Sequence, residues 1–279
     1  MNIDKISVPV PLRSESDDLV LTFIGTGSAF TKKNYQNNLI VVKNDTHLII
    51  DIGTKATQGL FEKGIKVADI KAYLVTHVHA DHIGSFEEVA LIGRYFTKQK
   101  PDLIIPPVLK DIFWENSLKG GIAYNEKPLL TLDDVFSVVT PRKLRKYPRP
   151  TYGINYKGID VKIFKTNHIP GEAKTLEEAA WASGVIIDER VLFTADTKFD
   201  RAMLDDFDKM FDIELILHDC QFFTGGVHAS YDELKALPDK YKKKMLLTHY
   251  ADNWEQFKPE NDGFMGFTQR DLRYSFAKK

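Results

Sequence analysis

The feature that most constrains this chain is a short apolar run that is followed at once by a dense group of metal-binding side chains. The run from Ala72 to Thr76 is apolar and β-branched, which predicts a buried strand. Gly84 permits a tight turn, and the amphipathic pattern over 86–96 predicts a helix. Between the two lie His77, His79, Asp81 and His82. Imidazoles and a carboxylate at the end of a strand indicate a site for zinc or a similar divalent ion.

Three further predicted strands also end on a candidate ligand. They cover 161–166, 191–194 and 245–248, and they deliver His168, Asp196 and His249. The ends of strands are where α/β architectures place their chemistry, because the sheet fixes the origin of each loop. The four strand ends together therefore predict one composite site.

The complete set of ligands suits two ions. We assign His77, His79 and His168 to one ion, Asp81, His82 and His249 to the other, and Asp196 to both. Two ions about 3.5–4 Å apart can share a hydroxide that attacks a phosphoryl group. Three or four protein ligands per ion leave positions for water and substrate, which is typical of a catalytic rather than a structural site.

Composition places the chain among ordinary soluble proteins. With 279 residues, 43% hydrophobic and 28% charged, it predicts a single domain over 1–279. A net charge of −1 argues against a surface built wholly for polyanions. Cys220 is the only cysteine, which fits a reducing cytoplasm. Residues 1–18 have no apolar core of a signal peptide, and no run is long enough to span a membrane, so we expect a cytoplasmic enzyme.

Outside the ligands, the pattern is that of alternating strands and helices with two irregular segments. Residues 1–18 are polar with two prolines, and we expect a loosely held N-terminal arm. Residues 100–150 are rich in proline and predict an insertion within the fold, with a short helix over 109–118. The basic cluster over 142–149 faces either a phosphate or solvent, and the small-residue loop Gly25 to Ala29 forms either a phosphate cradle or a tight turn.

The ligand spacing identifies a superfamily. His-X-His-X-Asp-His, followed by a distant His, Asp and His, resembles the metallo-β-lactamase superfamily, and the resemblance runs from Leu19 to His249. It implies an α/β fold, the αββα sandwich of two mixed β-sheets flanked by helices, with a dinuclear site at the sheet edge. The cofactors that it implies are two divalent metal ions, zinc before manganese, because several ions accept this donor set.

Three further segments narrow the branch. They are Thr26-Gly-Ser28, the stretch His218-Asp-Cys-Gln-Phe222, and Gly225-Gly-Val-His-Ala-Ser230, and they look like the ribonuclease Z-type phosphodiesterases. The resemblance implies that His228 acts beside the metals and, with Asp81, protonates the leaving oxygen. It gives His218 a structural role. His47, which lies in the middle of a strand without partner ligands nearby, is also interpreted as structural.

One departure from that branch bears on the substrate. Ribonuclease Z enzymes insert a long tRNA-gripping arm between the third His and the bridging Asp, whereas here 27 residues separate His168 from Asp196. Without the arm, tRNA binding loses its main electrostatic contribution. The segment His218 to Pro238 is similar to anti-Pycsar proteins, which hydrolyse cyclic mononucleotides. We therefore predict a phosphodiesterase for a small-molecule phosphodiester, a 3′,5′-cyclic mononucleotide, that uses a metal-bound hydroxide.

Other functions stay open at this point. The first alternative is a ribonuclease Z-like RNA 3′-processing endonuclease or another nuclease, and the second is a carboxyester, lactone or β-lactam hydrolase. A metal-holding module that sequesters a nucleotide without cutting it is a third. Members of this branch are commonly homodimers, so loop 117–124 or loop 253–267 is a candidate for contact with a partner subunit.

Overall fold

The chain forms two compact units, which we describe separately. The computed structural model describes residues 1–14 and 16–278. The first unit contains 1–25, 35–141 and 270–279, and the second contains 26–34 and 142–269. Glu15 of the predicted arm and Lys279 lie outside the described residues. The single domain over 1–279 stays a prediction.

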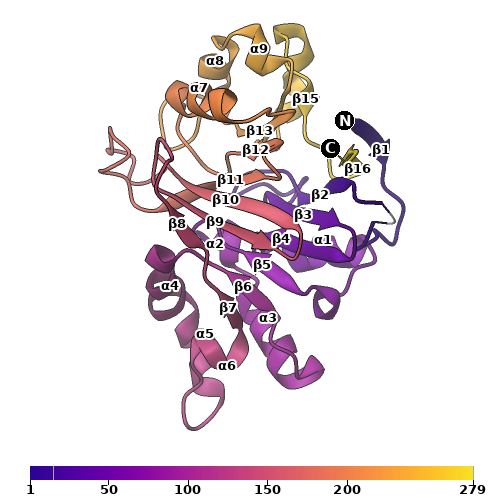
Figure 1. Cartoon of the computed structure of the whole chain (residues 1–279), viewed down its shortest axis with the longest axis vertical. Helices are drawn as coiled ribbons and strands as arrows, with labels where there is room; N and C mark the ends of the chain where they lie inside the picture. The colour runs from indigo at the N-terminus through magenta and orange to yellow at the C-terminus, as the bar shows by residue number, and fades with distance from the viewer. Residues whose placement is uncertain (15, 279) are drawn as a thin grey trace. The chain divides into compact units, whose positions relative to one another are not determined.

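The first unit is built on a mixed eight-stranded sheet of order β1-β16-β2-β3-β4-β5-β6-β7 (Figure 1). Its strands from β1 to β4 and β16 pair antiparallel, and those from β4 to β7 pair parallel. The hairpin of β3 and β4 turns at Asn44, which has a φ of 52°. The strands are β1 (Asn2–Lys5), β2 (Leu19–Gly25), β3 (Asn38–Lys43), β4 (Thr46–Ile50), β5 (Ala72–Leu74), β6 (Asp102–Ile104), β7 (Ser137–Val139) and β16 (Leu272–Phe276).

Six short helices accompany this sheet. The first of them is followed by Gly64 at a φ of 70°, as expected for a C-terminal cap. The helix expected over 86–96 ends as an α-helix at Leu91 and continues as a π-helical turn, Ile92–Thr97. The helices are α1 (Ala56–Glu62), α2 (Ala80–Ile83), α3 (Phe86–Leu91), α4 (Pro107–Phe113), α5 (Lys119–Ile122) and α6 (Leu132–Val135).

An aromatic cluster holds β5 against these helices. The Phe86 ring meets the rings of Tyr73, Phe113 and Phe136 edge-on, at centroid distances of 5.5, 5.1 and 5.9 Å. All four side chains are buried. Edge-to-face aromatic pairs contribute about 0.5–1.5 kcal/mol beyond the area that they bury. The strand that leads to the first ligands is thereby fixed in the core.

The N-terminal arm is anchored more firmly than its polar sequence predicts. β1 pairs with β16, Val10 N donates to the Lys63 carbonyl at 2.9 Å, and Ser14 N donates to the Asn44 carbonyl at 2.8 Å. The expectation of a loosely held arm is therefore wrong for its described residues. The reason is tertiary: the arm finds backbone partners that no local pattern reveals.

The proline-rich segment over 100–150 supplies regular structure to both units. In the first unit it provides β6 and β7, and the helix expected over 109–118 begins at Pro107 as α4. In the second unit it provides the edge strand β8 (Arg142–Leu144). Its prolines separate these elements but do not prevent them, because each strand is short.

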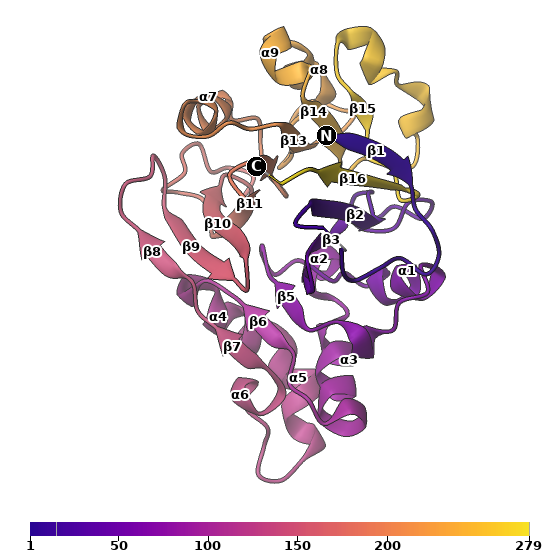
Figure 2. The same ribbon diagram turned by 45° about the vertical axis from the view of Figure 1, so that its right-hand side comes forward.

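The second unit has its own mixed eight-stranded sheet, of order β15-β14-β13-β12-β11-β10-β9-β8 (Figure 2). The strands from β8 to β12 pair antiparallel, and those from β12 to β15 pair parallel. Residues 182–187 and 191–193 form an antiparallel hairpin. The strands after β8 are β9 (Thr151–Tyr156), β10 (Ile159–Thr166), β11 (Ala182–Ile187), β12 (Val191–Phe193), β13 (Leu215–Asp219), β14 (Met245–Thr248) and β15 (Gly266–Phe267).

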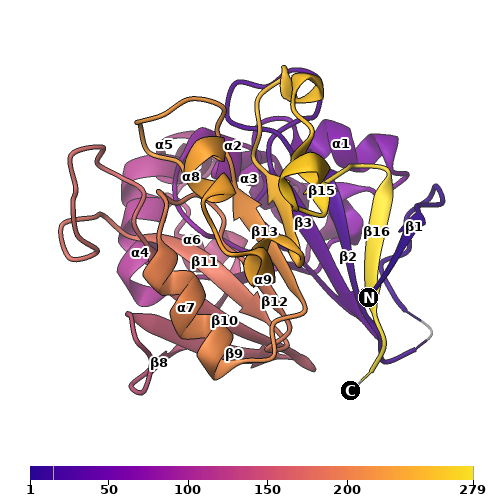
Figure 3. The same ribbon diagram turned by 90° about the horizontal axis from the view of Figure 1, so that it is seen from above.

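Three helices pack on one face of the second sheet (Figure 3). They are α7 (Arg201–Met210), α8 (Tyr231–Lys235) and α9 (Asp239–Lys242). Phe207 of α7 and Tyr241 of α9 are buried in one cluster with Phe164 of β10 and Leu247 of β14. Among the helices of the described residues, none is both long and apolar enough to cross a bilayer.

Candidate metal centre

In the first unit, all four predicted ligands emerge between β5 and the first turn of α2. His77 follows the strand, His79 has the extended backbone of a helix N-cap, and Asp81 and His82 lie within α2. Gly53 permits this arrangement, because a Cβ there would lie 1.9 Å from the Asp81 carbonyl oxygen. His77, Asp81 and His82 are buried, and His79 is partly exposed.

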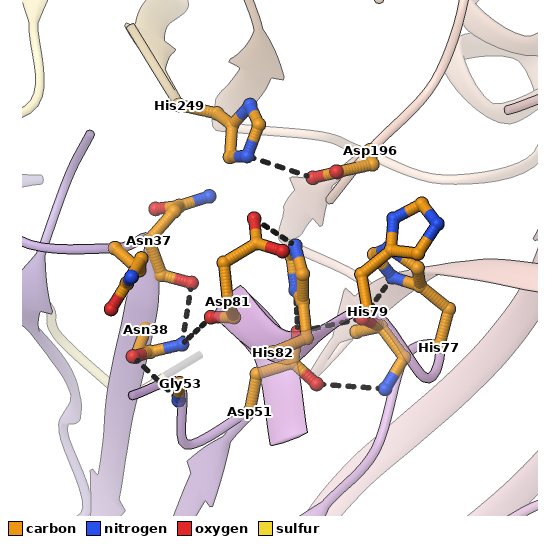
Figure 4. Close-up of polar contacts among 12 residues, drawn as sticks. Asn37, Asn38, Asp51, Gly53, His77, His79, Asp81, His82, Asp196 and His249 are labelled. Atoms are coloured by element: carbon orange, nitrogen blue, oxygen red, sulfur yellow. Dashed lines mark hydrogen bonds and ion pairs between the residues drawn. The ribbon is translucent and has the colours of Figure 1, made fainter. Parts of the chain in front are cut away.

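A buried carboxylate that the sequence analysis did not single out orients one of these imidazoles. Asp51 Oδ2 lies 2.7 Å from His82 Nδ1 (Figure 4). The same carboxylate accepts hydrogen bonds from the Thr76 amide at 2.8 Å and from the Thr76 hydroxyl at 2.6 Å. A carboxylate bound to Nδ1 fixes the tautomer of a metal-ligating histidine and leaves Nε2 for the ion. The only sequence signal for Asp51 was its position directly after β4.

The four ligands of the first unit form two pairs. His77 Nε2 lies 3.1 Å from His79 Nδ1, and His82 Nε2 lies 3.2 Å from Asp81 Oδ2. The Thr76 hydroxyl lies 3.1 Å from His77 Nδ1, so the nitrogen of His77 that does not face His79 also has a polar neighbour. Two ligands of one zinc ion, each about 2.0–2.1 Å from it in tetrahedral geometry, lie about 3.4 Å apart. Both pairs have the spacing of ligands that share an ion.

In the second unit, three different strands each deliver one predicted ligand. His168 follows β10, Asp196 follows β12, and His249 follows β14. His168 Nε2 lies 3.6 Å from Asp196 Oδ2, and His249 Nε2 lies 3.5 Å from Asp196 Oδ1. Figure 4 shows the second of these contacts. Each oxygen of Asp196 therefore faces a different imidazole.

The remaining nitrogens of these two histidines are also engaged. His168 Nδ1 lies 3.0 Å from the Val227 carbonyl, and His249 Nδ1 lies 3.2 Å from Asp219 Oδ1. Their Nε2 atoms are thus the ones presented to an ion, in the orientation typical of metal-binding histidines. The sequence analysis did not assign a role to Asp219, which is the last residue of β13.

Backbone strain marks the same positions. Asp51, Ala195 and His249 have φ values of 62°, 46° and 59°, in the left-handed region that residues with a Cβ rarely adopt. Such conformations cost about 1–3 kcal/mol each and persist only where the surrounding structure holds them. Here they lie at or beside ligands, as expected for a functional site.

His228, the predicted proton donor, lies beside the ligands of the second unit. Its Nδ1 is 2.7 Å from Asp219 Oδ2, and its side chain is 20% exposed. A ligand atom each from Asp196, Asp219, His228 and His249 lie within 4.8 Å of one another. Burial by itself lowers the pKa of His228, but the Asp219 carboxylate outweighs it and the pKa is raised. Asp219 thus stabilises an imidazolium at this position.

The small-residue loop after β2 forms a tight turn whose amides are already used. Thr26 N donates to the Asn34 carbonyl at 3.0 Å, and Ser28 N donates to the Tyr250 carbonyl at 3.0 Å. His249 N in turn donates to the Thr26 carbonyl at 2.8 Å. These two amides therefore cannot also cradle a phosphate, and the loop supports the backbone of His249 instead.

The two histidines interpreted as structural are engaged by the protein. His47 Nδ1 lies 3.0 Å from the Leu12 carbonyl, and its Nε2 accepts from the Lys71 amide at 3.1 Å. His218 is buried, with Nδ1 2.8 Å from the Asp219 carbonyl. In the basic cluster, Arg149 is buried and pairs with Asp200 at 2.9 Å, whereas most of its neighbours face solvent.

The donor set of both units fits divalent metal ions. It consists of imidazole nitrogens and carboxylate oxygens, which suit zinc and similar ions. In His82, His168 and His249 a protein oxygen holds Nδ1, which leaves Nε2 for an ion. His77, His79, Asp81 and His82 belong to the first unit, and His168, Asp196, His228 and His249 belong to the second.

Comparison with known proteins places this chain in a family. The model of the family "Anti-Pycsar protein Apyc1" matches residues 19–274. An anti-Pycsar protein of Bacillus phage vB_BsuM-Goe3 is 39% identical over 249 residues, which cover 86% of this chain and 92% of the relative. One from Paenibacillus xerothermodurans is 33% identical over 261 residues, which cover 93% and 98%.

Solved structures agree on the fold. The metallo-β-lactamase fold protein YhfI from Bacillus subtilis superposes with a TM-score of 0.66 at 14% identity, covering 93% of this chain and 100% of its own. A diphosphatase of the PhnP family gives a TM-score of 0.64 at 16% identity, covering 92% and 98%. Human tRNase Z, short form, gives a TM-score of 0.58 at 15% identity, covering 91% of this chain and 98% of its own.

These matches confirm the predicted fold class, two mixed sheets flanked by helices. The chain belongs to the anti-Pycsar protein Apyc1 family and is a metal-dependent hydrolase, a phosphodiesterase, with the metallo-β-lactamase fold.

Proposed function

We propose that this protein hydrolyses a 3′,5′-cyclic mononucleotide to a linear monophosphate, using two divalent metal ions. The observation that carries the two-ion proposal is Asp196, whose two oxygens face the Nε2 atoms of two different histidines, His168 and His249. A carboxylate placed in this way serves as a ligand shared by two ions. The family to which the chain belongs supports the substrate.

The proposed ligand sets follow the pairs within each unit. His77 and His79 bind one ion together with His168, and Asp81 and His82 bind the other together with His249, while Asp196 is shared. We propose zinc, with manganese as the alternative. When bound, such ions lower the pKa of a coordinated water and polarise the phosphoryl oxygens.

His228 and Asp219 supply proton transfer in this proposal. Asp219 holds His228 Nδ1 at 2.7 Å, so Nε2 is the atom left to exchange a proton with the substrate. Asp219 is itself fixed by the Thr197 amide, which donates to its Oδ2 at 2.9 Å. An imidazolium here donates its Nε2 proton to the leaving alkoxide as the P–O bond breaks. The partnership of His228 with Asp81 stays a prediction.

The segment between His168 and Asp196 favours a small substrate over tRNA. It contains 27 residues, and β11 and β12 lie within it, so it is too short for a long arm. The net charge of −1 also provides no general attraction for a polyanion. The fold likeness to human tRNase Z keeps RNA 3′-end processing as the second candidate.

A hydrolysis panel tests this proposal. The metal-loaded full chain is incubated with cyclic mononucleotides, cyclic dinucleotides and a precursor tRNA, and the products are separated by chromatography. We expect linear monophosphates from the cyclic mononucleotides and none from Asp196→Ala. The control His47→Gln, in a histidine that binds only backbone, should retain activity. Intact cyclic mononucleotides alongside a trimmed tRNA would contradict the proposal.

We propose that the enzyme is a cytoplasmic homodimer and that loop 117–124 makes the contact. Tyr124 is 71% exposed, so its ring is available to a partner subunit. In the other predicted loop, Phe264 and Phe267 are buried in the core of the second unit, so they are not available to a partner. Light scattering should give twice the chain mass, and Tyr124→Asp should give a monomer. A wild-type monomer would refute the dimer.

A further inference from the structure

The loop that carries His228 also carries an exposed aromatic ring. Phe223 is 66% exposed, although its neighbour Phe222 packs in the core, stacked on Phe257 at a centroid distance of 3.9 Å and an angle of 10°. Of these two consecutive side chains, Phe222 packs against the protein and Phe223 faces solvent. Exposing most of a phenylalanine forfeits on the order of 1–2 kcal/mol of burial, and this ring is the exposed aromatic on the loop that ends at His228.

The loop is closed at its base, so its side chains are confined to a small region. Gln221 N donates to the Ala229 carbonyl at 2.8 Å, and Tyr231 N donates to the Gln221 carbonyl at 2.8 Å. Residues 222–228 form the loop above this closure. Phe223 and His228 therefore leave the sheet within one short turn of chain.

The conformation of the loop brings the Phe223 ring against the backbone of Gly226. Gln221 Nε2 donates to the Phe223 carbonyl at 2.9 Å and also to the Gly225 carbonyl. Gly225 and Gly226 have φ values of 81° and 91°, which turn the chain back on itself. A Cβ at Gly226 would lie 3.6 Å from Phe223 Cε2, so the ring rests against the backbone two residues before His228.

We propose that Phe223 is a substrate-positioning residue, on whose ring the base of the nucleotide stacks while His228 acts on its phosphate. This inference rests on the proposed function and adds a site for the base. A nucleotide carries its flat base and its phosphate at opposite ends. An aromatic face beside the proton donor matches that arrangement, and stacking accepts any base because every base has a π-face.

The test compares Phe223→Ala and Phe223→Trp with the wild type by steady-state kinetics. Stacking contributes about 1–3 kcal/mol per base, so Phe223→Ala should raise KM about 5- to 150-fold and leave kcat nearly unchanged. The loss should be larger for purine than for pyrimidine cyclic nucleotides. Phe223→Trp should restore KM. The control Phe61→Ala, at a residue that is 77% exposed on α1, should behave as the wild type.

A substrate without a base separates stacking from damage to the loop. The 3′,5′-cyclic phosphate of methyl riboside should be cleaved equally by the wild type and by Phe223→Ala. An equal loss on this substrate, a fall in kcat, or a lower mass in light scattering would overturn the inference. A wild type that leaves every cyclic nucleotide intact would refute the proposed function instead, whereas an active enzyme indifferent to Phe223→Ala would refute only the role of this ring.

Discussion

The two units place their ligands at the same kind of position but gather them in different ways. In the first unit all four ligands follow a single strand, β5, within six residues of chain. In the second unit three strands, β10, β12 and β14, deliver one ligand each. The first set depends on one local segment, whereas the second exists only when its sheet is assembled. Local changes should therefore damage the two halves to different degrees.

Each half also contains one buried carboxylate that holds an imidazole nitrogen. Asp51 binds His82 Nδ1 in the first unit, and Asp219 contacts the Nδ1 atoms of His228 and His249 in the second. Asp51 therefore serves only a ligand. Asp219 contacts both a proposed ligand and the proposed proton donor, so we expect the two carboxylates to act alike in metal binding but not in catalysis.

The largest expected effect is at the shared ligand. Asp196→Ala removes the carboxylate that faces the Nε2 atoms of both His168 and His249. Losing several kcal/mol of transition-state stabilisation should lower kcat/KM about 10³-fold or more. Asp81→Ala should lower metal content by one ion per chain and should leave more activity than Asp196→Ala does. Equal metal content in both variants, measured by plasma mass spectrometry, would contradict a shared ligand.

The next effect distinguishes proton transfer from metal binding. His228→Ala should lower kcat on cyclic nucleotides about 10²- to 10⁴-fold, because the leaving alkoxide loses its general acid. The same variant should cleave bis(p-nitrophenyl) phosphate almost as the wild type does, since nitrophenolate leaves without a proton. A similar loss on both substrates would assign His228 to metal binding instead.

The two buried carboxylates provide the direct comparison between the units. Asp51→Asn and Asp219→Asn should each weaken metal affinity about 10- to 100-fold, as measured by competition with a chelator. With metal in excess, Asp51→Asn should recover most of its activity. Asp219→Asn should not, because His228 loses the carboxylate that stabilises its charged form. If excess metal restored activity in both variants, the two carboxylates would not differ in their catalytic roles.

A smaller effect is expected where Asp252 holds the loop after β2. Its carboxylate accepts from the Lys32 and Lys33 amides at 2.8 and 2.9 Å and also from the Thr31 hydroxyl. Asp252→Ala should lower the free energy of unfolding by about 2 kcal/mol, and Asp252→Asn by less. Urea denaturation measures both. An unchanged free energy of unfolding in Asp252→Ala would show that these hydrogen bonds do not stabilise the second unit.

The smallest effect is a pH dependence confined to the first unit. Burial lowers the pKa of His47, although the Leu12 carbonyl opposes this. Between the folded pKa and the usual value of about 6.5, the unfolded chain binds more protons, so stability falls as the pH drops below 6.5. His47→Gln should lower the free energy of unfolding by about 1 kcal/mol at neutral pH, and this free energy should depend less on pH than in the wild type. Equal slopes of unfolding free energy against pH in the wild type and in His47→Gln would contradict the assignment of this pH dependence to His47.

The sequence by itself determined the superfamily and indicated the candidate ligands, because both depend on local patterns. A buried strand followed by His77, His79, Asp81 and His82 is visible within about a dozen residues, and His168, Asp196 and His249 each follow a recognisable strand. Their roles in catalysis stay predictions. The fold class that this spacing implied is confirmed.

The tertiary structure decided which atoms face one another. Nothing in the sequence distinguishes Asp51 and Asp219 from other acidic residues after strands, since their role depends on hydrogen bonds to residues up to 31 positions away. The anchoring of the arm and the opposite directions of Phe222 and Phe223 were hidden for the same reason. Spacing along a chain reports local geometry, whereas these contacts form only when segments distant in sequence pack together.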